Sequence, residues 1–217
     1  MENSEARVPA ESDHGRDKGR MKLDLRFSER PLEDLWCEAV VALVFQRKFL
    51  TMGALAGLDG KLGGLLGRLE EGEIWTGAEG ENLLVASQGM IKAEKILLCG
   101  LGPAPDCDPA CLAGRVEQAG VALLKMHVQD FGIHIPAMEG RESEYPSHLE
   151  TAVHHLVSPY LRAYCKNAEF RLKVVFSLER FLTGPMLPAV ESIREGFGPE
   201  VEVSVVLERE RKNAINT

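Results

Sequence analysis

The residues with the clearest chemical potential are the glycines of LDGKLGGLLGRLEEG, residues 58–72, which interrupt an otherwise amphipathic helical pattern. Glycine inside a helix costs about 1 kcal/mol relative to alanine, so something must come close to this backbone. Gly60, Gly63 and Gly64 would let amide N–H groups approach a phosphate-bearing ligand. Close packing of the helix on a sheet is the alternative, and it is the interpretation that we favour.

A second candidate for phosphate binding is the loop EGRESEYP at residues 139–146. Gly140, Arg141 and Ser143 are its candidate ligand-binding residues, and Arg141 could form a bidentate contact with a phosphate. The three glutamates of the same loop bring negative charge, which opposes such binding. We therefore interpret the loop as a solvated surface of mixed charge. Gly102, at the end of KILLCGLG, is the remaining candidate ligand-binding glycine.

The histidines and cysteines predict no catalytic or metal site. His154 and His155 are adjacent on a predicted helix and point about 100° apart, so they cannot easily share a ligand. Cys107 and Cys111 lack the second pair of ligands that a structural zinc site needs. His134 is either a buried histidine whose hydrogen bonds are satisfied or one that faces a cleft, and it has no identifiable nucleophile partner. We expect no catalytic residue, no metal and no cofactor.

Composition limits the function classes. The chain has 217 residues, of which 45% are hydrophobic and 27% are charged, and its formal net charge is -8. This charge disfavours nucleic acid and anionic membranes as partners. The longest apolar run, EAVVALVFQ, is too short to span a bilayer. The five scattered cysteines and the lack of a secretory signal predict a cytoplasmic location.

Strands and helices are expected to alternate along most of the chain. Residues 1–20 predict a disordered tail, because they contain almost no large apolar side chains, and residues 21–217 predict a single domain. Met1 and Met21 are both possible natural start residues of the protein. The predicted strands are MKLDLRF, CEAVVALVFQ, ENLLVAS, KILLCGLG, GIHIPAM, RLKVVFSL and VEVSVVLE. The predicted helices run from Leu58 to Glu70, from the cap Asp108 to Gly132, from a Ser147–Glu150 capping box, and through MLPAVESIREGFG.

This alternation favours an α/β sandwich around a mixed or mostly parallel sheet. Ligands of such folds usually bind beyond the carboxyl ends of the strands. We expect the loops at 47–57, 101–108 and 138–146 to lie there. A cleft between residues 60–64 and 140–145 would then be the place to look for an anion.

Two stretches resemble the N-terminal domain of the leucyl aminopeptidase family. They are LDGKLGGLLGRLEEGEIWTGAEGENLLV and KILLCGLGP, and the resemblance covers roughly residues 35–135. That domain has a helix with paired glycines, an F-x-G-x-x-G-E turn and a strand that ends in GLG. The residues that match these features are Gly63, Gly64, Trp75, Gly77, Gly80, Glu81, Gly100 and Gly102.

The second half of the chain looks like the last part of a macro domain. The similar stretches are IHIPAMEGRESEYPSHLETAVHHLVSPYLRAY and LKVVFSLERFLTGPMLPAVESI. Since the aminopeptidase N-terminal domain is itself macro-like, both resemblances imply a three-layer α/β/α macro-like domain with a mixed, mostly parallel sheet. In ADP-ribose-binding macro domains, a glycine-rich helix start and a later glycine-rich loop enclose the pyrophosphate.

The resemblance does not extend to peptidase catalysis. Nothing like the aminopeptidase motif NTDAEGR occurs, and no cluster of carboxylates for two-metal hydrolysis is readable. The resemblance implies a non-catalytic, stand-alone relative that serves in binding, assembly or regulation. Its partner would be a second copy, another protein or a separately encoded peptidase. The alternative is a macro-like domain that binds or hydrolyses a nucleotide or an ADP-ribose-type ligand, a phosphate-bearing small molecule.

Overall fold

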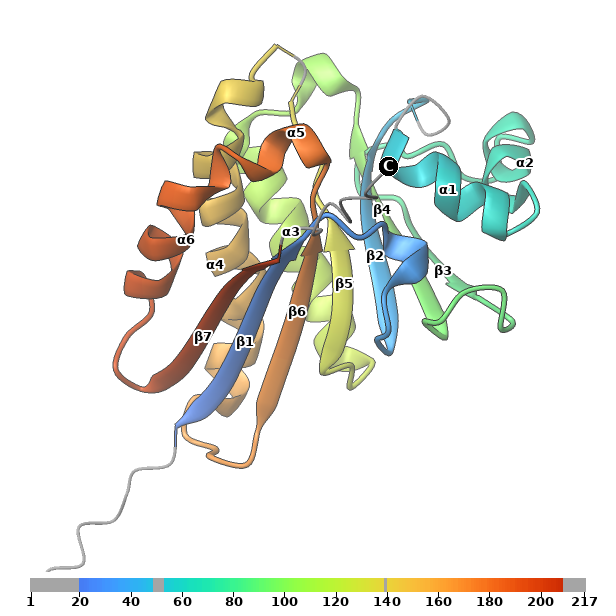
Figure 1. Ribbon diagram of the computed structural model, residues 1–217. Coiled ribbons are helices and arrows are strands. Elements are labelled where there is room, and N and C mark those ends of the chain that lie inside the picture. Colours follow the sequence, from blue (N-terminus) through green and yellow to red (C-terminus); the bar gives the residue numbers. More distant parts are fainter. Residues whose placement is uncertain (1–19, 49–52, 139, 209–217) are drawn as a thin grey trace, which may run out of the picture.

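Seven strands form one sheet within the residues that the computed structural model describes, which are 20–48, 53–138 and 140–208 (Figure 1). The strands are β1 (Met21–Ser28), β2 (Ala39–Phe45), β3 (Asn82–Ala86), β4 (Lys95–Gly102), β5 (Asp130–His134), β6 (Arg171–Ser177) and β7 (Val201–Glu208). Their order in space is β3-β4-β2-β5-β6-β1-β7. Each neighbouring pair is parallel except β3 with β4. The predicted mixed, mostly parallel sheet is confirmed.

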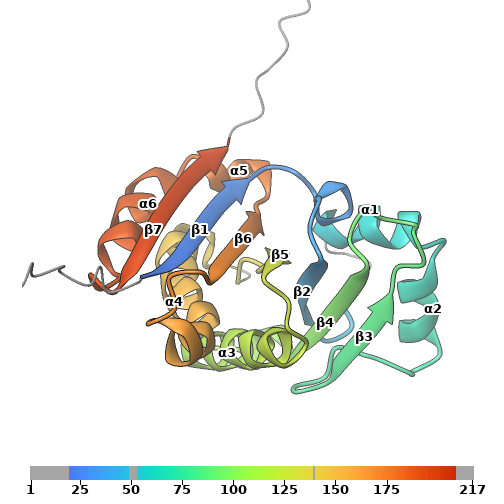
Figure 2. The same ribbon diagram turned by 90° about the horizontal axis from the view of Figure 1, so that it is seen from below.

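Helices lie on both faces of the sheet, as Figures 1 and 2 show. The helices are α1 (Gly53–Lys61), α2 (Leu65–Glu71), α3 (Pro109–Lys125), α4 (Tyr145–Tyr164), α5 (Arg180–Thr183) and α6 (Met186–Glu195), with 3₁₀ helices at Leu32–Asp34, Ala104–Asp106 and Glu142–Glu144. Val116, Leu156 and Ile193 bring α3, α4 and α6 into the larger hydrophobic core on one face. Leu58 and Leu66 bring α1 and α2 into a second core, against β2 and β4 on the other face. The fold is the expected three-layer α/β/α sandwich.

The patterns of β2 and β1 explain their places in the sheet. Every residue of β2 is buried, as expected for a parallel strand that is covered on both faces. Most of β1 alternates buried and partly exposed residues, so one face packs on helices and the other reaches solvent. The predictions of a fully buried strand and of a half-buried strand that begins at Met21 are both confirmed.

The connection from β1 to β2 is unusually short. Parallel strands are usually joined by a crossover of a dozen or more residues that contains a helix. Here residues 29–38 make the connection with only the 3₁₀ helix Leu32–Asp34, and Leu35 lies against Gly132 of β5. Among the described residues no helix covers β6, β1 and β7 on the face where α1 and α2 lie, so this second helical layer covers only part of the sheet (Figure 2).

The predicted helix from Leu58 to Glu70 is wrong, because the chain forms two helices there. Gly63 and Gly64 have φ angles of 64° and 75°, a left-handed conformation that ends α1 and precedes α2. The N–H of Gly64 donates to the carbonyl of Asp59 at 2.9 Å, as at many helix C-termini. A Cβ atom added at Gly60 or Gly63 would meet nothing within 4 Å, so the close-packing interpretation is also wrong.

Two other helix boundaries differ from the prediction. α3 ends at Lys125, and His127 adopts a left-handed φ of 56°, so that β5 begins at Asp130 instead of Gly132. α4 begins at Tyr145, and therefore Ser147 lies within its first turn and does not cap it. The predicted cap of α3 is confirmed, since the Asp108 side chain accepts a hydrogen bond from the N–H of Cys111.

Some predictions concern residues outside this description. The predicted tail, apart from Arg20, lies outside the described residues, and the loop at 47–57 is described only in part. No helix in the described part of the chain has the combination of length and apolar character that crossing a membrane requires.

The left-handed turn predicts how the paired glycines respond to substitution. Gly63→Ala should lower the free energy of unfolding by about 1 kcal/mol, because alanine resists a positive φ. The matched change Gly60→Ala, inside α1, should be neutral or stabilising by up to about 1 kcal/mol. Urea unfolding followed by circular dichroism measures both changes. Equal effects of the two changes would contradict the conformational role.

Candidate functional site

The carboxyl ends of the parallel strands meet along one edge of the sheet, where ligands of such folds usually bind (Figure 1). The predicted segments 101–108 and 138–146 follow β4 and β5 at this edge. Two further segments also begin there, namely 29–38 after β1 and 178–186 after β6. No sequence motif marked either of them.

The predicted glycines Gly60, Gly63 and Gly64 lie at the corner between α1 and α2. α1 begins at Gly53, so Gly60 is about 10 Å further along the helix axis and not at a helix start. The N–H of Leu66 donates to Asp59 Oδ1 at 2.8 Å. A carboxylate of the chain itself thus occupies the N-terminus of α2, which is the position where a bound anion would lie.

In the loop before α4, a carboxylate of the chain again accepts a hydrogen bond from a backbone N–H group. Gly140 has a φ of 75°, and its N–H donates to Glu142 Oε1 at 3.1 Å. Arg141 and Ser143 are exposed, and the N–H of Arg141 donates to the carbonyl of Met138 at 2.9 Å. An acidic side chain of the loop therefore already accepts a hydrogen bond from the glycine N–H that a phosphate would use.

The two predicted segments lie on different faces of the sheet. The corner at residues 60–64 belongs to the helices that cover β2 and β4, whereas α4, which follows the 140–145 loop, belongs to the opposite layer. None of the cavities described below is lined by both segments.

Gly102 lies where a tight turn closes over the end of β4. Its N–H donates to the carbonyl of Gly77 at 3.0 Å, and its carbonyl accepts from the N–H of Gln46 at 2.8 Å. A Cβ atom at Gly100 would lie only 2.1 Å from the carbonyl oxygen of Ala78, so glycine is required for the turn to approach this closely. Gly102 thus has a structural role at the junction of β2 and β4.

A partly buried network of hydrogen bonds holds the same turn. The Glu81 carboxylate accepts from the N–H of Thr76 at 2.9 Å and from the N–H of Ala78 at 3.1 Å. These N–H groups lower the pKa of Glu81, because they stabilise its charged form. Arg115 of α3 forms an ion pair with Glu79. The glycines and the two glutamates of the W-T-G-A-E-G-E stretch therefore attach the turn to the sheet and to α3.

The histidines each have a different neighbour. His148 Nε2 lies 3.3 Å from Glu144 Oε2, and His155 Nδ1 lies 3.2 Å from Glu117 Oε2. The ring of His154 packs on Phe197 at a centroid distance of 4.7 Å. Within the described ranges, no group of three His, Cys, Asp or Glu side chains is placed to hold a metal ion.

One cavity lies at the carboxyl edge, between the ends of β1 and β6. Its volume is about 310 Å³, and it is lined by Glu29, Pro31, Gly53, Ser177, Leu178, Glu179 and Arg180. Arg180 Nε lies 3.3 Å from Glu29 Oε2, and burial raises the pKa of Glu179. Two carboxyl groups and one guanidinium make this cavity a poor site for a pyrophosphate and a better one for a small ligand with hydrogen-bond donors.

His134 lies beside this cavity and is fully buried. Its Nδ1 lies 3.1 Å from the carbonyl oxygen of Ser177, which lines the cavity. Its Nε2 has no hydrogen-bond partner among the described residues. Burial lowers the pKa of His134, because the charged imidazolium is poorly solvated there. The predicted burial of His134 is confirmed, but only one of its two ring nitrogens has a hydrogen-bond partner among the described residues.

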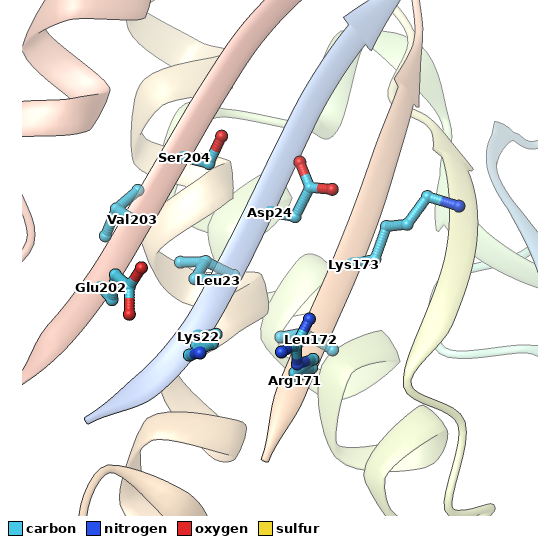
Figure 3. Close-up of a pocket in the computed structure, with 9 residues that line it drawn as sticks. All are labelled: Lys22, Leu23, Asp24, Arg171, Leu172, Lys173, Glu202, Val203 and Ser204. Atoms are coloured by element: carbon cyan, nitrogen blue, oxygen red, sulfur yellow. The ribbon is translucent and has the colours of Figure 1, made fainter. Parts of the chain in front are cut away.

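A second hollow lies on the open face of β7, β1 and β6 (Figure 3). It has a volume of about 360 Å³, and its charged side chains are Lys22, Asp24, Arg171, Lys173 and Glu202. Lys173 Nζ lies 2.9 Å from Asp130 Oδ2, and Asp24 Oδ2 lies 2.9 Å from Arg26 Nη2. Since charges of both signs line the hollow, and Asp24 and Lys173 each pair with a neighbouring residue outside it, this face carries no strong charge of one sign.

Comparison with known proteins adds the family context. The family model "Cytosol aminopeptidase family, N-terminal domain" matches residues 40–162. A search of curated proteins found no match. The matched range contains both the turn at residues 75–81, which packs over the end of β4, and the corner between α1 and α2 at Gly63 and Gly64.

Solved structures share the fold at low sequence identity. A mutant of tomato leucine aminopeptidase is 13% identical with a TM-score of 0.57, and the match covers 82% of this chain and 37% of that chain. A mutant macrodomain from Oceanobacillus iheyensis is 12% identical with a TM-score of 0.58, over 79% of this chain and 93% of that one. A Trypanosoma brucei macrodomain in complex with ADP-ribose is 18% identical with a TM-score of 0.51, over 75% and 67%. This chain therefore spans little more than a third of the length of the tomato aminopeptidase chain.

The carboxylate at the N-terminus of α2 should be important for stability. Asp59→Ala is expected to lower the free energy of unfolding by about 1 kcal/mol, as the loss of an N-cap acceptor usually does. Glu71→Ala, at the exposed opposite end of α2, should change it little. Urea unfolding of both variants checks this expectation. A negligible effect of Asp59→Ala would show that water replaces the carboxylate at no cost.

Burial of His134 predicts a pH-dependent stability. The unfolded imidazole binds a proton near pH 6.5, whereas the folded one stays neutral to lower pH. The unfolded state then binds more protons just below pH 6.5, so the free energy of unfolding falls as the pH drops through this window. Unfolding titrations between about pH 7.5 and 5.5 should show a shallower fall for His134→Gln than for the parent.

The exposed His127 provides the control, since His127→Asn suits a positive φ and should keep the parent's pH dependence. The pKa of Glu179, which burial raises from its ordinary value of 4.5, acts on stability in the opposite direction. His154, whose pKa burial also lowers, and Glu179 are both unchanged in His134→Gln, so the difference between the two curves reports His134. Parallel curves for the parent and His134→Gln would contradict this assignment.

Proposed function

The chain belongs to the cytosol aminopeptidase family through its N-terminal domain, and from this premise we propose that these 217 residues form a non-catalytic binding and assembly domain. We propose residues 21–217 as one domain, preceded by a disordered tail at 1–20. A cytosolic location is proposed from the family description. Assembly with a second copy or with another protein is the proposed mode of action.

The observation that carries this proposal is the occupation of the anion-binding positions by the chain's own carboxylates. Asp59 occupies the N-terminus of α2, and Glu142 accepts from the N–H of Gly140. A phosphate at either position would have to displace a carboxylate that is already hydrogen-bonded. Macro-like phosphate recognition at these two loops is therefore disfavoured on electrostatic grounds.

Peptidase chemistry is also unsupported by the described residues. Two-metal hydrolysis needs several carboxylates around ions that lie about 3.5–4 Å apart. The described ranges contain no three-residue group that is placed to hold even one metal ion. The match to the tomato aminopeptidase covers 37% of that chain, and its activity is not carried over to these residues.

A small-ligand function is the second candidate, and one cavity favours it. The cavity of about 310 Å³ at the ends of β1 and β6 contains Arg180, and His134 lies beside it. A macrodomain of similar fold is described in complex with ADP-ribose. A nucleotide or ADP-ribose-type ligand, bound or hydrolysed, would have to place a phosphate on Arg180 against the charges of Glu29 and Glu179.

Isothermal titration calorimetry distinguishes the two candidates. We expect no binding heat with ADP-ribose, ADP or inorganic phosphate, because the glycine N–H groups already have carboxylate acceptors. Binding that Arg180→Ala abolishes and that Arg141→Ala preserves would overturn the proposal in favour of the cavity. Binding that Arg141→Ala abolishes would instead favour the 140–145 loop. Hydrolysis of the pyrophosphate bond of ADP-ribose, which releases AMP and ribose 5-phosphate, would indicate catalysis.

A further inference from the structure

β3 is an edge strand without the usual protection of edge strands. It ends the sheet order and pairs only with β4 among the described strands. Its sequence, NLLVA, has no charged residue and no proline, and the side chain of Leu84 is 54% exposed. Natural proteins usually place charges, prolines or bulges on an edge strand, because a bare apolar edge pairs with other strands. This edge is therefore suited to strand addition.

The backbone of β3 presents a symmetric set of free groups. The N–H of Gly100 donates to the carbonyl of Glu81 at 2.7 Å, and the N–H of Ser87 donates to the carbonyl of Glu94 at 2.9 Å. Alternate residues of an antiparallel strand direct their N–H and C=O groups to opposite sides, so the odd-numbered residues face β4. Asn82, Leu84 and Ala86 then direct theirs outward, evenly spaced about Leu84.

An identical strand is the natural complement of this arrangement. In antiparallel pairing centred on Leu84, Asn82 lies opposite Ala86 of the second copy and Leu84 lies opposite Leu84 of the second copy. Each of these pairs exchanges both of its hydrogen bonds. The contact uses the same residues from both copies, as a closed two-fold interface requires.

An apolar groove adjoins this edge. It has a volume of about 460 Å³ and lies between α2 and β3, and its apolar lining includes Leu62, Leu65, Leu69, Leu83, Val85 and Met90. Arg68 is the single charged residue in this lining, and its Nη1 donates to the carbonyl of Gly63 at 2.7 Å. With a net charge of -8, two copies repel each other in general, and a groove without acidic side chains is where that repulsion is least.

The opposite edge of the sheet does not allow the same contact. β7 carries Glu202 and Glu208 within VEVSVVLE. Antiparallel self-pairing of β7 centred on Val205 would bring Glu202 opposite Glu208 of the second copy. Like charges directly opposite each other destabilise strand pairing. The two edges thus differ in charge, and β3 is the one that accepts a copy of itself.

We propose that two copies of this chain pair through β3, antiparallel and centred on Leu84, to form one continuous sheet across a two-fold axis. This inference rests on the proposed assembly function and names its partner. The pairing places Leu83 opposite Val85 of the second copy, on the same face as the groove of each copy.

Sedimentation velocity of the full chain over a range of concentrations tests the pairing. The parent should sediment as a dimer, and Leu84→Lys should weaken dimerisation by about 100-fold or more, because two like charges meet at the two-fold axis. Leu187→Lys is the matched control, because Leu187 on α6 is 53% exposed and the variant makes the same leucine-to-lysine change at another surface. The control should remain dimeric.

Amide hydrogen exchange provides a second readout that does not depend on a variant. The outward N–H groups of Leu84 and Ala86 should exchange more slowly as the parent concentration rises. A dimer that Leu84→Lys leaves intact would overturn the β3 contact while leaving the assembly function in place. A parent that stays monomeric, with Leu84 and Ala86 amides exchanging at a constant rate, would overturn self-pairing altogether. Calorimetry with nucleotides decides the non-catalytic proposal separately.

Discussion

Main-chain N–H groups at helix starts and tight turns must find acceptors, and in this chain carboxylates provide many of them. Asp59 accepts from the start of α2, Asp108 from the start of α3, and Glu81 from the turn at Thr76. The corner between α1 and α2 and the turn over β4 both depend on these hydrogen bonds. The acidic balance of the sequence is thus partly a requirement of its backbone, and it leaves little room for a bound anion.

The turn at residues 76–81 shows how this constraint determines the arrangement of larger elements. Gly100 allows the turn to approach β4, Glu81 holds its N–H groups, and Arg115 connects it to α3. One short segment therefore joins the ends of β2 and β4 to α3, which lies in the helical layer on the side of the larger core. The turn and Gly100 both lie within the range matched by the family model, residues 40–162.

Much of the fold could be predicted from local pattern, because strand burial leaves a clear periodicity. The full burial of β2 and the alternation along β1 are visible in their sequences. The break at Gly63 and Gly64 was harder to predict, since glycine is compatible with close packing, ligand approach and a positive φ alike. The φ angles of 64° and 75°, and the open space around Gly63, distinguish these causes once the structure is known.

The candidate site was less predictable than the fold. The cavity beside Ser177 combines segments from the two halves of the chain, and no motif links Glu29 to Arg180. The roles of Asp59 and Glu142 were also hidden, because an acidic residue near a glycine does not reveal which N–H group it will accept from. A contact between residues far apart in the chain can be predicted only when the strand order is known, and local sequence does not contain that order.

The strand order also has a consequence for the time course of synthesis. β1 lies between β6 and β7, with Leu25 beside Val174 on one side and Val205 on the other. Within this sheet β1 is the first strand to be synthesised, and it therefore has no partner until residues from 171 onward have been made. The half of the sheet formed by β2, β3 and β4 can assemble meanwhile from contacts closer in sequence. While the residues between β1 and β6 are synthesised, the nascent chain thus carries a β-strand that has no partner in its sheet.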